Sequence, residues 1–327
     1  MEINFTVNKP HNWLENVADQ FGVAIQNNTI YLPKNLGDGF LRHYYLTNEF
    51  VLTYLRFKLK HPLTFIRNAG EVTHLSPITF YIHKKKFQQV VAHETREISA
   101  KSPNGIFWPS AQMGTKWEFP LNEWVSNITI VTNHQFILNS LKETKVNYVH
   151  QLLNSTKPFY ISEEMTQEML DISDEIINVI DHGHHPAVSN LFIESKVIQL
   201  LAIFLEKIIE RPLNKSTSDL KTDDVDKLFR TKSVILNDLS KVPPIKDLAA
   251  TVGISESKLQ KLFKQVFGKS IYQYSLYEKM RLAKKMLQSK KYSISEIGYQ
   301  LGYSNLSHFS KAFRNQFGVN PRDCTSI

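Results

Sequence analysis

The chain has 327 residues, of which 42% are hydrophobic and 21% charged, with one cysteine and a formal net charge of +8. This length is enough for two domains with substantial cores, and a single cysteine excludes an intramolecular disulfide framework. The chain starts without the basic and apolar segments of a secretory signal, and its most apolar stretch, residues 197–205, is shorter than a bilayer span. These features predict a soluble, cytoplasmic protein with no membrane partner.

The first 135 residues are predicted to form a β-rich domain. Residues 50–59, 78–83 and 127–132 are rich in β-branched and aromatic side chains, and turn signals such as Asn27-Asn28 separate such segments. Several short strands of this kind favour a small barrel or sandwich.

Alternation along residues 50–59 places Arg56 on the same strand face as Tyr54 and Lys58. If that face lines the interior of a barrel, Arg56 favours an acidic ligand and is the candidate effector-binding residue. If the face lies in solvent, Arg56 is a surface charge. The sequence identifies no other residue of an effector pocket.

Residues 136–212 are predicted to be helical. Residues 163–179 and 188–210 carry apolar side chains at spacings of three and four, which is typical of helices with a buried face. The second helix is apolar over much of its circumference, so it either forms a dimer interface or packs against the β-rich domain. A polar linker, residues 213–224, is expected to follow.

The histidines of the chain do not predict a metal site. His182, His184 and His185 stand together in a Gly-Pro segment and could ligate a metal ion, and His93 with Glu97 could do so only on a helix. The spacing does not reproduce a metal-cupin pattern, and such a cluster between helices is usually a solvated connection. The sequence also contains no phosphate-binding glycine loop or nucleophile elbow. We therefore expect no metal, no cofactor and no catalytic residue, and a protein that is not an enzyme.

The last third of the chain contains one pattern twice, about 50 residues apart. Leu259, Phe263 and Phe267 recur at a spacing of four, as do Phe309, Phe313 and Phe317, so each trio lies on one face of a helix. A shorter apolar stripe precedes each trio and ends at a glycine, Gly253 or Gly302, and Ser255 or Ser304 is placed to cap the helix that follows. Each copy therefore predicts a helix-turn-helix unit.

The positive charge of the chain is concentrated in the same region. Residues 231–327 contain 16 Lys and Arg against 6 Asp and Glu, which leaves 23 against 25 for residues 1–230. Such an excess favours a polyanionic partner and salt-dependent binding. Double-stranded DNA is the predicted partner.

These motifs give residues 225–327 a resemblance to the DNA-binding domain of the AraC/XylS family of bacterial transcription regulators. The second copy carries the family pattern as Ile294-Ser-Glu-Ile-Gly298, Gly302-Tyr-Ser304, Ser307-His-Phe-Ser-Lys-Ala-Phe-Arg314 and Phe317-Gly-Val-Asn-Pro321. Gly298, Lys311 and Cys324 depart from the residues usual in the family. The resemblance implies an all-α C-terminal domain with two helix-turn-helix units, an α+β chain overall, and a cupin-like N-terminal barrel that makes residues 1–135 the effector-binding domain.

The resemblance also implies which residues contact DNA. A helix spanning residues 271–288 would join the two units and set them into successive major grooves on one face of the duplex. Glutamine can pair with adenine, and lysine can donate to guanine or to phosphate. The predicted DNA-binding residues are Ser257, Lys258, Gln260, Lys261 and Lys264 in the first unit, and Leu306, Ser307, His308, Lys311 and Arg314 in the second.

Together these observations predict a transcription regulator that binds a specific DNA sequence and responds to a small-molecule effector. The resemblance favours an activator, with RNA polymerase as a further partner and a homodimer as the assembly. Two alternatives remain at this point: a constitutive regulator whose N-terminal domain only dimerises, and a metal-dependent cupin enzyme with a DNA-binding tail.

Overall fold

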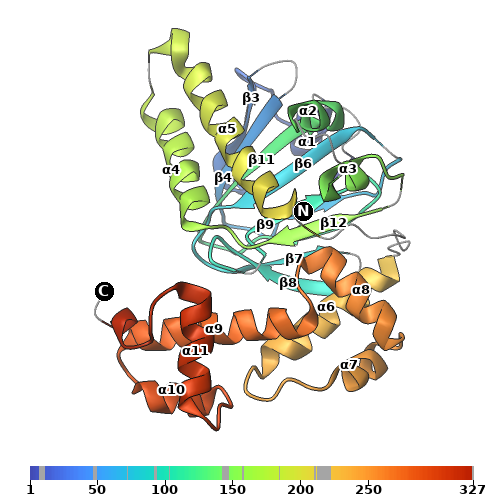
Figure 1. Cartoon of the computed structure of the whole chain (residues 1–327). Coiled ribbons are helices and arrows are strands. Elements are labelled where there is room, and N and C mark those ends of the chain that lie inside the picture. The colour runs from blue at the N-terminus through green and yellow to red at the C-terminus, as the bar shows by residue number, and fades with distance from the viewer. Residues whose placement is uncertain are drawn as a thin grey trace. The chain divides into compact units, whose positions relative to one another are not determined.

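The chain divides into two structural units, Met1–Val225 and Asp226–Ile327. Figure 1 shows the computed structural model, and each unit is described by itself. The structure describes residues 1–6, 12–46, 50–71, 73–91, 94–102, 104–141, 147–156, 158–183, 185–209, 211 and 222–325. The predicted linker, residues 213–224, lies mostly outside these ranges, so its boundaries stay a prediction.

The first unit contains two β-sheets. The five-stranded sheet has the order β1-β5-β10-β7-β8, with β1 parallel to β5 and the other pairs antiparallel. Its strands are β1 (Glu2–Phe5), β5 (Thr64–Arg67), β10 (Thr115–Glu118), β7 (Phe87–Val91) and β8 (Glu94–Ile98). The prediction of a β-rich N-terminal domain is confirmed.

The seven-stranded sheet is antiparallel throughout and has the order β12-β9-β6-β11-β4-β3-β2. Its strands are β12 (Tyr160–Glu163), β9 (Ile106–Pro109), β6 (Leu75–Tyr81), β11 (Trp124–Asn133), β4 (Phe50–Leu59), β3 (Gly37–Tyr45) and β2 (Thr29–Tyr31). Strand β12 lies inside the segment that the sequence predicts to be helical. A strand of four residues at a sheet edge gives too short a pattern to recognise beside helices.

Alternation along the central strands divides the first unit into layers. The even-numbered side chains of β4, such as Leu52 and Tyr54, join a core with α2 (His134–Ser140), α3 (Tyr148–Leu153), α4 (Gln167–His182) and α5 (Pro186–Ile209). The odd-numbered side chains, Thr53 and Leu55, point to a cavity whose opposite wall includes Phe65 of β5. Helices therefore cover one face of the large sheet, and the small sheet faces the other. Helix α1 (Asn12–Phe21) adds Trp13 to the cavity wall.

Helix α5 matches the helix predicted at residues 188–210, and its apolar part extends beyond residues 197–205. By length and composition alone, residues Ala187–Ile209 would suit a membrane span. Its inward side chains, which include Val197, Leu200 and Phe204, are fully buried in the helix-covered core. Leu191 on the other side is 64% exposed, and Phe192 and Ile198 are also exposed. The helix thus packs on the sheet, as one of the two predicted alternatives requires, and also presents an apolar strip.

A buried ionic cluster fastens the end of α5 to β12. Glu163 accepts hydrogen bonds from Arg211 and, at 3.0 Å, from Lys207, and Glu163 and Arg211 are each only 7% exposed. Burial by itself would lower the pKa of Arg211, but the charge of Glu163 and the contact with Tyr148 outweigh burial and raise it. Arg211, which follows the end of α5, is therefore part of the folded unit.

The second unit is all-helical. After α6 (Thr222–Asn237), its helices are α7 (Ile245–Val252), α8 (Glu256–Phe267), α9 (Ile271–Ser289), α10 (Ile294–Gln300), α11 (Leu306–Phe317) and the short η1 (Asp323–Thr325). The prediction of an all-α C-terminal domain with two helix-turn-helix units is confirmed.

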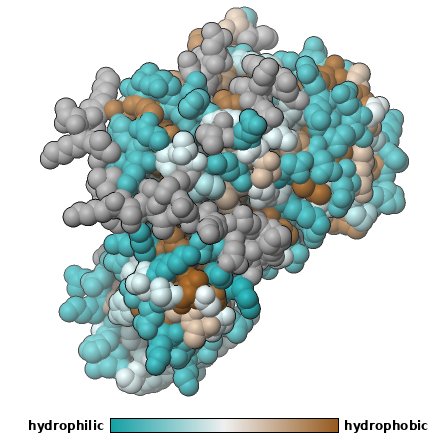
Figure 2. All heavy atoms as spheres, turned by 90° about the vertical axis from the view of Figure 1, so that its right-hand side faces the viewer, coloured by the Kyte–Doolittle hydropathy of each residue, from teal (hydrophilic) through white to brown (hydrophobic). Residues whose placement is uncertain are grey.

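The part of the surface drawn in Figure 2 is mainly hydrophilic, with small, separate apolar patches. The apolar side chains of the described residues are otherwise largely buried. Such a distribution is ordinary for a protein that folds in water.

Candidate nucleic-acid interface and intersheet cavity

The first helix-turn-helix unit consists of α7 and α8. Helix α7 ends at Gly253, whose φ of +66° is the left-handed conformation that glycine adopts at low cost. The Ser255 side chain then accepts a hydrogen bond from the backbone N–H of Lys258 and caps α8. Leu259 and Phe263 turn inward and are fully buried. The glycine stop and the serine cap are confirmed.

The second helix-turn-helix unit, α10 and α11, repeats this arrangement with a different cap. Ser293 and Glu296 form a reciprocal capping box at the start of α10. Gly302 has φ +81°, and a Cβ at this position would lie 2.3 Å from the backbone oxygen of Ser240, so only glycine fits. The cap of α11 is Asn305, whose side chain accepts from the N–H of Ser307 at 2.8 Å. The prediction of Ser304 as this cap is wrong, because the turn is one residue longer than in the first helix-turn-helix unit.

Gly298 allows α10 and α11 of the second helix-turn-helix unit to approach each other. A Cβ there would lie 2.6 Å from Leu306 Cδ2 and 3.5 Å from the Phe309 ring. A larger residue at position 298 would therefore require these side chains to move. Leu306 lies half-buried against α10, so its side chain contributes to packing at the base of the predicted interface.

Helix α9 joins the two helix-turn-helix units and contributes side chains to both of their cores. Tyr274 packs on Phe263 of the first helix-turn-helix unit, with ring centroids 5.4 Å apart. Met280, Ala283 and Leu287 are buried in the second core with Phe309 and Phe313. At about 1.5 Å per residue, its 19 residues span roughly 28 Å. A continuous helix fixed at both ends holds the two units at a set spacing.

Helices α8 and α11 expose equivalent faces. Each has 12 residues, begins 50 positions from the other and ends at a left-handed glycine, Gly268 or Gly318. Of the predicted DNA-binding residues, the exposed ones are Ser257, Gln260, Lys264, Ser307, His308, Lys311 and Arg314, while Lys258, Lys261 and Leu306 are half-buried. DNA contact by all ten therefore stays a prediction, and Leu306 also takes part in packing against α10.

Comparisons with known proteins identify this region. The family model described as "Helix-turn-helix domain" matches residues 248–326. The chain is 28% identical over 167 residues to the Msm operon regulatory protein of Streptococcus mutans, and 36% identical over 95 residues to the HTH-type transcriptional regulator ArgR of Pseudomonas aeruginosa. The C-terminal domain belongs to the AraC/XylS family.

The matches to these two regulators each cover only part of the chain. The alignments cover 50% and 28% of this chain, and 58% and 29% of the two regulators, respectively. A solved structure, an AraC-type transcriptional regulator from Chromobacterium violaceum, aligns with 31% identity over 32% of this chain and 95% of its own length, at a TM-score of 0.31. The chain thus aligns with less than two thirds of the length of the Msm operon regulatory protein and of ArgR.

The first unit contains a cavity between its two sheets. Its volume is about 90 Å³, and its wall is mostly aromatic and aliphatic, including Phe5, Trp13, Phe65, Phe107 and Trp117. Arg56, the candidate effector-binding residue, does not line this cavity. It lies on the opposite face of the large sheet, where it forms an ion pair with Asp181 of α4 at 2.8 Å.

The sequence identifies none of the cavity residues, and two of them, Arg67 and Thr53, are polar and only 3% and 4% exposed. Alternation along β5 puts Arg67 on the same face as Phe65, but a strand of four residues that contains a single charge gives no reason to place that charge inside. Thr53 belongs to the recognised strand 50–59, yet which of its two faces would meet a cavity depends on the second sheet.

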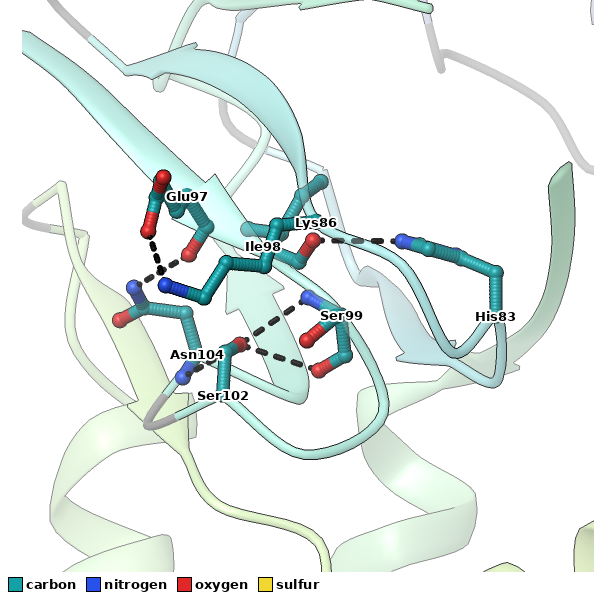
Figure 3. Close-up of polar contacts among 7 residues, drawn as sticks. All are labelled: His83, Lys86, Glu97, Ile98, Ser99, Ser102 and Asn104. Atoms are coloured by element: carbon teal, nitrogen blue, oxygen red, sulfur yellow. Dashed lines mark hydrogen bonds and ion pairs between the residues drawn. The ribbon is translucent and has the colours of Figure 1, made fainter. Parts of the chain in front are cut away.

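A hydrogen-bond network contacts the cavity wall at Asn127. Asn127, which lines it, has its Oδ1 3.2 Å from Nδ1 of the buried His83, and His83 Nε2 donates to the carbonyl of Ile98 at 3.2 Å. Figure 3 shows the His83 ring directed at Ile98, beside the bonds that join Ser99 to Ser102. Burial lowers the pKa of His83. These bonds fix the cavity wall at Asn127.

No cluster suitable for a metal ion is found among the described residues, when groups of three or more His, Cys, Asp or Glu side chains are considered. His184 and His93 lie outside those residues. The expectation that the chain binds no metal therefore stays a prediction, as does the absence of catalysis.

Proposed function

We propose that this protein is a cytoplasmic transcription regulator that binds a specific DNA sequence through α8 and α11 and responds to a small-molecule effector in its first unit. The observation that carries the proposal is the duplicated helix-turn-helix unit, whose two equivalent exposed helices are joined by the single helix α9. Helices α8 and α11 would enter consecutive major grooves, which repeat about every 34 Å along one face of the duplex.

The chemistry of the exposed faces supports separate roles for individual residues. Gln260 can form a bidentate pair with adenine, whereas Lys311 can donate to guanine or to a phosphate. The basic excess of residues 231–327 would supply much of the affinity. Effector binding would shift the population toward a form able to engage both half-sites.

The exposed strip of α5 supports the rest of the proposed assembly. Four apolar side chains are exposed along one side of the helix: Val188, Leu191, Phe192 and Ile198. A second copy of the chain packed on this strip would give a homodimer with a self-complementary interface. RNA polymerase would be the further partner if the protein activates transcription.

Substitutions in the two recognition helices test DNA binding. In a salt series with the DNA upstream of the protein's own gene, Gln260→Ala and Lys311→Ala should each weaken binding by about 1–3 kcal/mol, which is about 5- to 150-fold. If Lys311 contacts phosphate, its loss should also reduce the salt slope by about one, while the neutral Gln260 should leave the slope unchanged.

The matched control is Lys60→Ala, which removes one exposed lysine from the first unit. It should bind within about twofold of the wild type, because the substituted residue lies outside the AraC-type domain. Binding that is the same for all four proteins would contradict the assignment of α8 and α11 as the reading helices.

A further inference from the structure

The cavity of the first unit contains a buried positive charge without a negative partner. Arg67 donates from Nη2 to the backbone oxygen of Ser110 at 2.7 Å, and within the described residues its Nε has no hydrogen-bond partner. No carboxylate forms an ion pair with it there. Burial lowers the pKa of Arg67 to about 10, so the guanidinium is still charged at neutral pH. A buried, unpaired charge is costly, and a ligand with the opposite charge would remove much of that cost.

The contrast with Arg96 shows that this is not the general state of buried arginines in the fold. Arg96, also fully inside the first unit, donates to Gln89 and to Ser162 and stacks on the Phe107 ring at 4.2 Å. Protein side chains therefore occupy the donors of Arg96, whereas a single backbone carbonyl serves Arg67. Arg67 itself lines the wall of the cavity.

A second unpartnered group lies in the same cavity. The Thr53 hydroxyl is buried and has no hydrogen-bond partner in the described part of the chain. The neighbouring hydroxyls of Thr79 and Thr129 bond to each other at 3.0 Å. The remaining wall is mainly aromatic and aliphatic. An apolar cavity with a few polar groups at defined positions is the usual composition of a small-molecule site.

We propose that this cavity binds a small organic monocarboxylate, whose carboxylate pairs with Arg67 and reaches the Thr53 hydroxyl while its apolar body packs among the aromatic rings. Roughly 10–15 Å³ of such space holds one water-sized group, so a cavity of about 90 Å³ accommodates about half a dozen non-hydrogen atoms. This size fits a short-chain fatty acid. The assignment deepens the proposed function, because the carboxylate would be the effector.

Direct titration of the full-length protein, without DNA, tests the assignment. Calorimetry would compare straight-chain carboxylates from acetate to hexanoate with butyramide, which matches butyrate in shape but is neutral. We expect butyrate-sized carboxylates to bind at least about tenfold more tightly than the amide, because only the charged ligand compensates Arg67. Failure of every carboxylate to bind, or equal binding of the amide, would overturn the proposal.

Arg67→Gln should weaken carboxylate binding at least about tenfold. Arg56→Gln is the matched control: it removes the same charge from the other face of the large sheet and should leave binding unchanged. Circular dichroism and retained DNA binding would show that each variant is folded, and if Arg67→Gln does not fold, the comparison of carboxylate with amide on the wild type still decides. Carboxylate binding by a protein that ignores its DNA would contradict the proposed function alone.

Discussion

Replacing Glu163 with alanine is expected to destabilise the first unit by about 3–5 kcal/mol. The carboxylate is the shared partner of Arg211 and Lys207, and its removal leaves the guanidinium of Arg211 buried without its negative charge. The cluster also fastens the C-terminal end of α5 to β12. Its loss therefore weakens the attachment of the helix layer to the large sheet.

Denaturant unfolding followed by tryptophan fluorescence measures this effect selectively. All four tryptophans, Trp13, Trp108, Trp117 and Trp124, belong to the first unit. The control is Glu118→Ala, because Glu118 pairs with Lys116 at 2.8 Å on the surface, where solvent screening leaves an ion pair little effect on stability. A loss for Glu163→Ala no greater than that of Glu118→Ala would show that the buried cluster does not stabilise the fold.

Phe309→Ala is expected to destabilise the second unit by a similar amount, about 3–5 kcal/mol. The ring is fully buried, and it contacts Tyr303 and Phe313 at centroid distances of 5.5 and 6.2 Å. Its removal leaves a cavity where α10 and α11 approach most closely, and the aromatic neighbours cannot collapse into it without moving the recognition helix.

Far-UV circular dichroism would follow this unfolding, since the second unit is helical and contains no tryptophan. Tyr299→Ala, which removes a 59% exposed aromatic ring from α10, is the control and should change stability by less than about 1 kcal/mol. The tryptophan transition should stay where it is in the wild type. Equal stability of Phe309→Ala and Tyr299→Ala would refute the packing described for this core.

The helix-turn-helix units could be predicted from the sequence because their determinants are local. The trio Leu259, Phe263 and Phe267 defines a buried helix face within nine residues, and Gly253 and Ser255 mark the turn. The duplication gave each element a second, independent indication. The error at Ser304 arose at the one point where the copies differ in length, since the side chain that reaches the first turn of α11 is then that of Asn305.

The cavity and the ionic cluster could not be predicted, because both depend on contacts between distant segments. Arg67 is buried only because β5 lies between β1 and β10 and faces β4 across the cavity. Glu163 and Arg211 are 48 residues apart and meet because β12 returns to the edge of the large sheet. Alternation predicted the two faces of residues 50–59 correctly, but only the second sheet decides which face meets the cavity, and that placed Arg56 outside it.

The binding of neighbouring half-sites by two rigidly joined helix-turn-helix units is tested most directly by changing the spacing of those half-sites. Affinity would be measured for the bound DNA site and for versions lengthened between its half-sites by half a helical turn, about five base pairs, and by a full turn, about ten. Because α9 is one continuous helix packed into both cores, both insertions should reduce affinity at least about tenfold. Recovery of full affinity with the ten-base-pair insertion, or indifference to both insertions, would contradict the account.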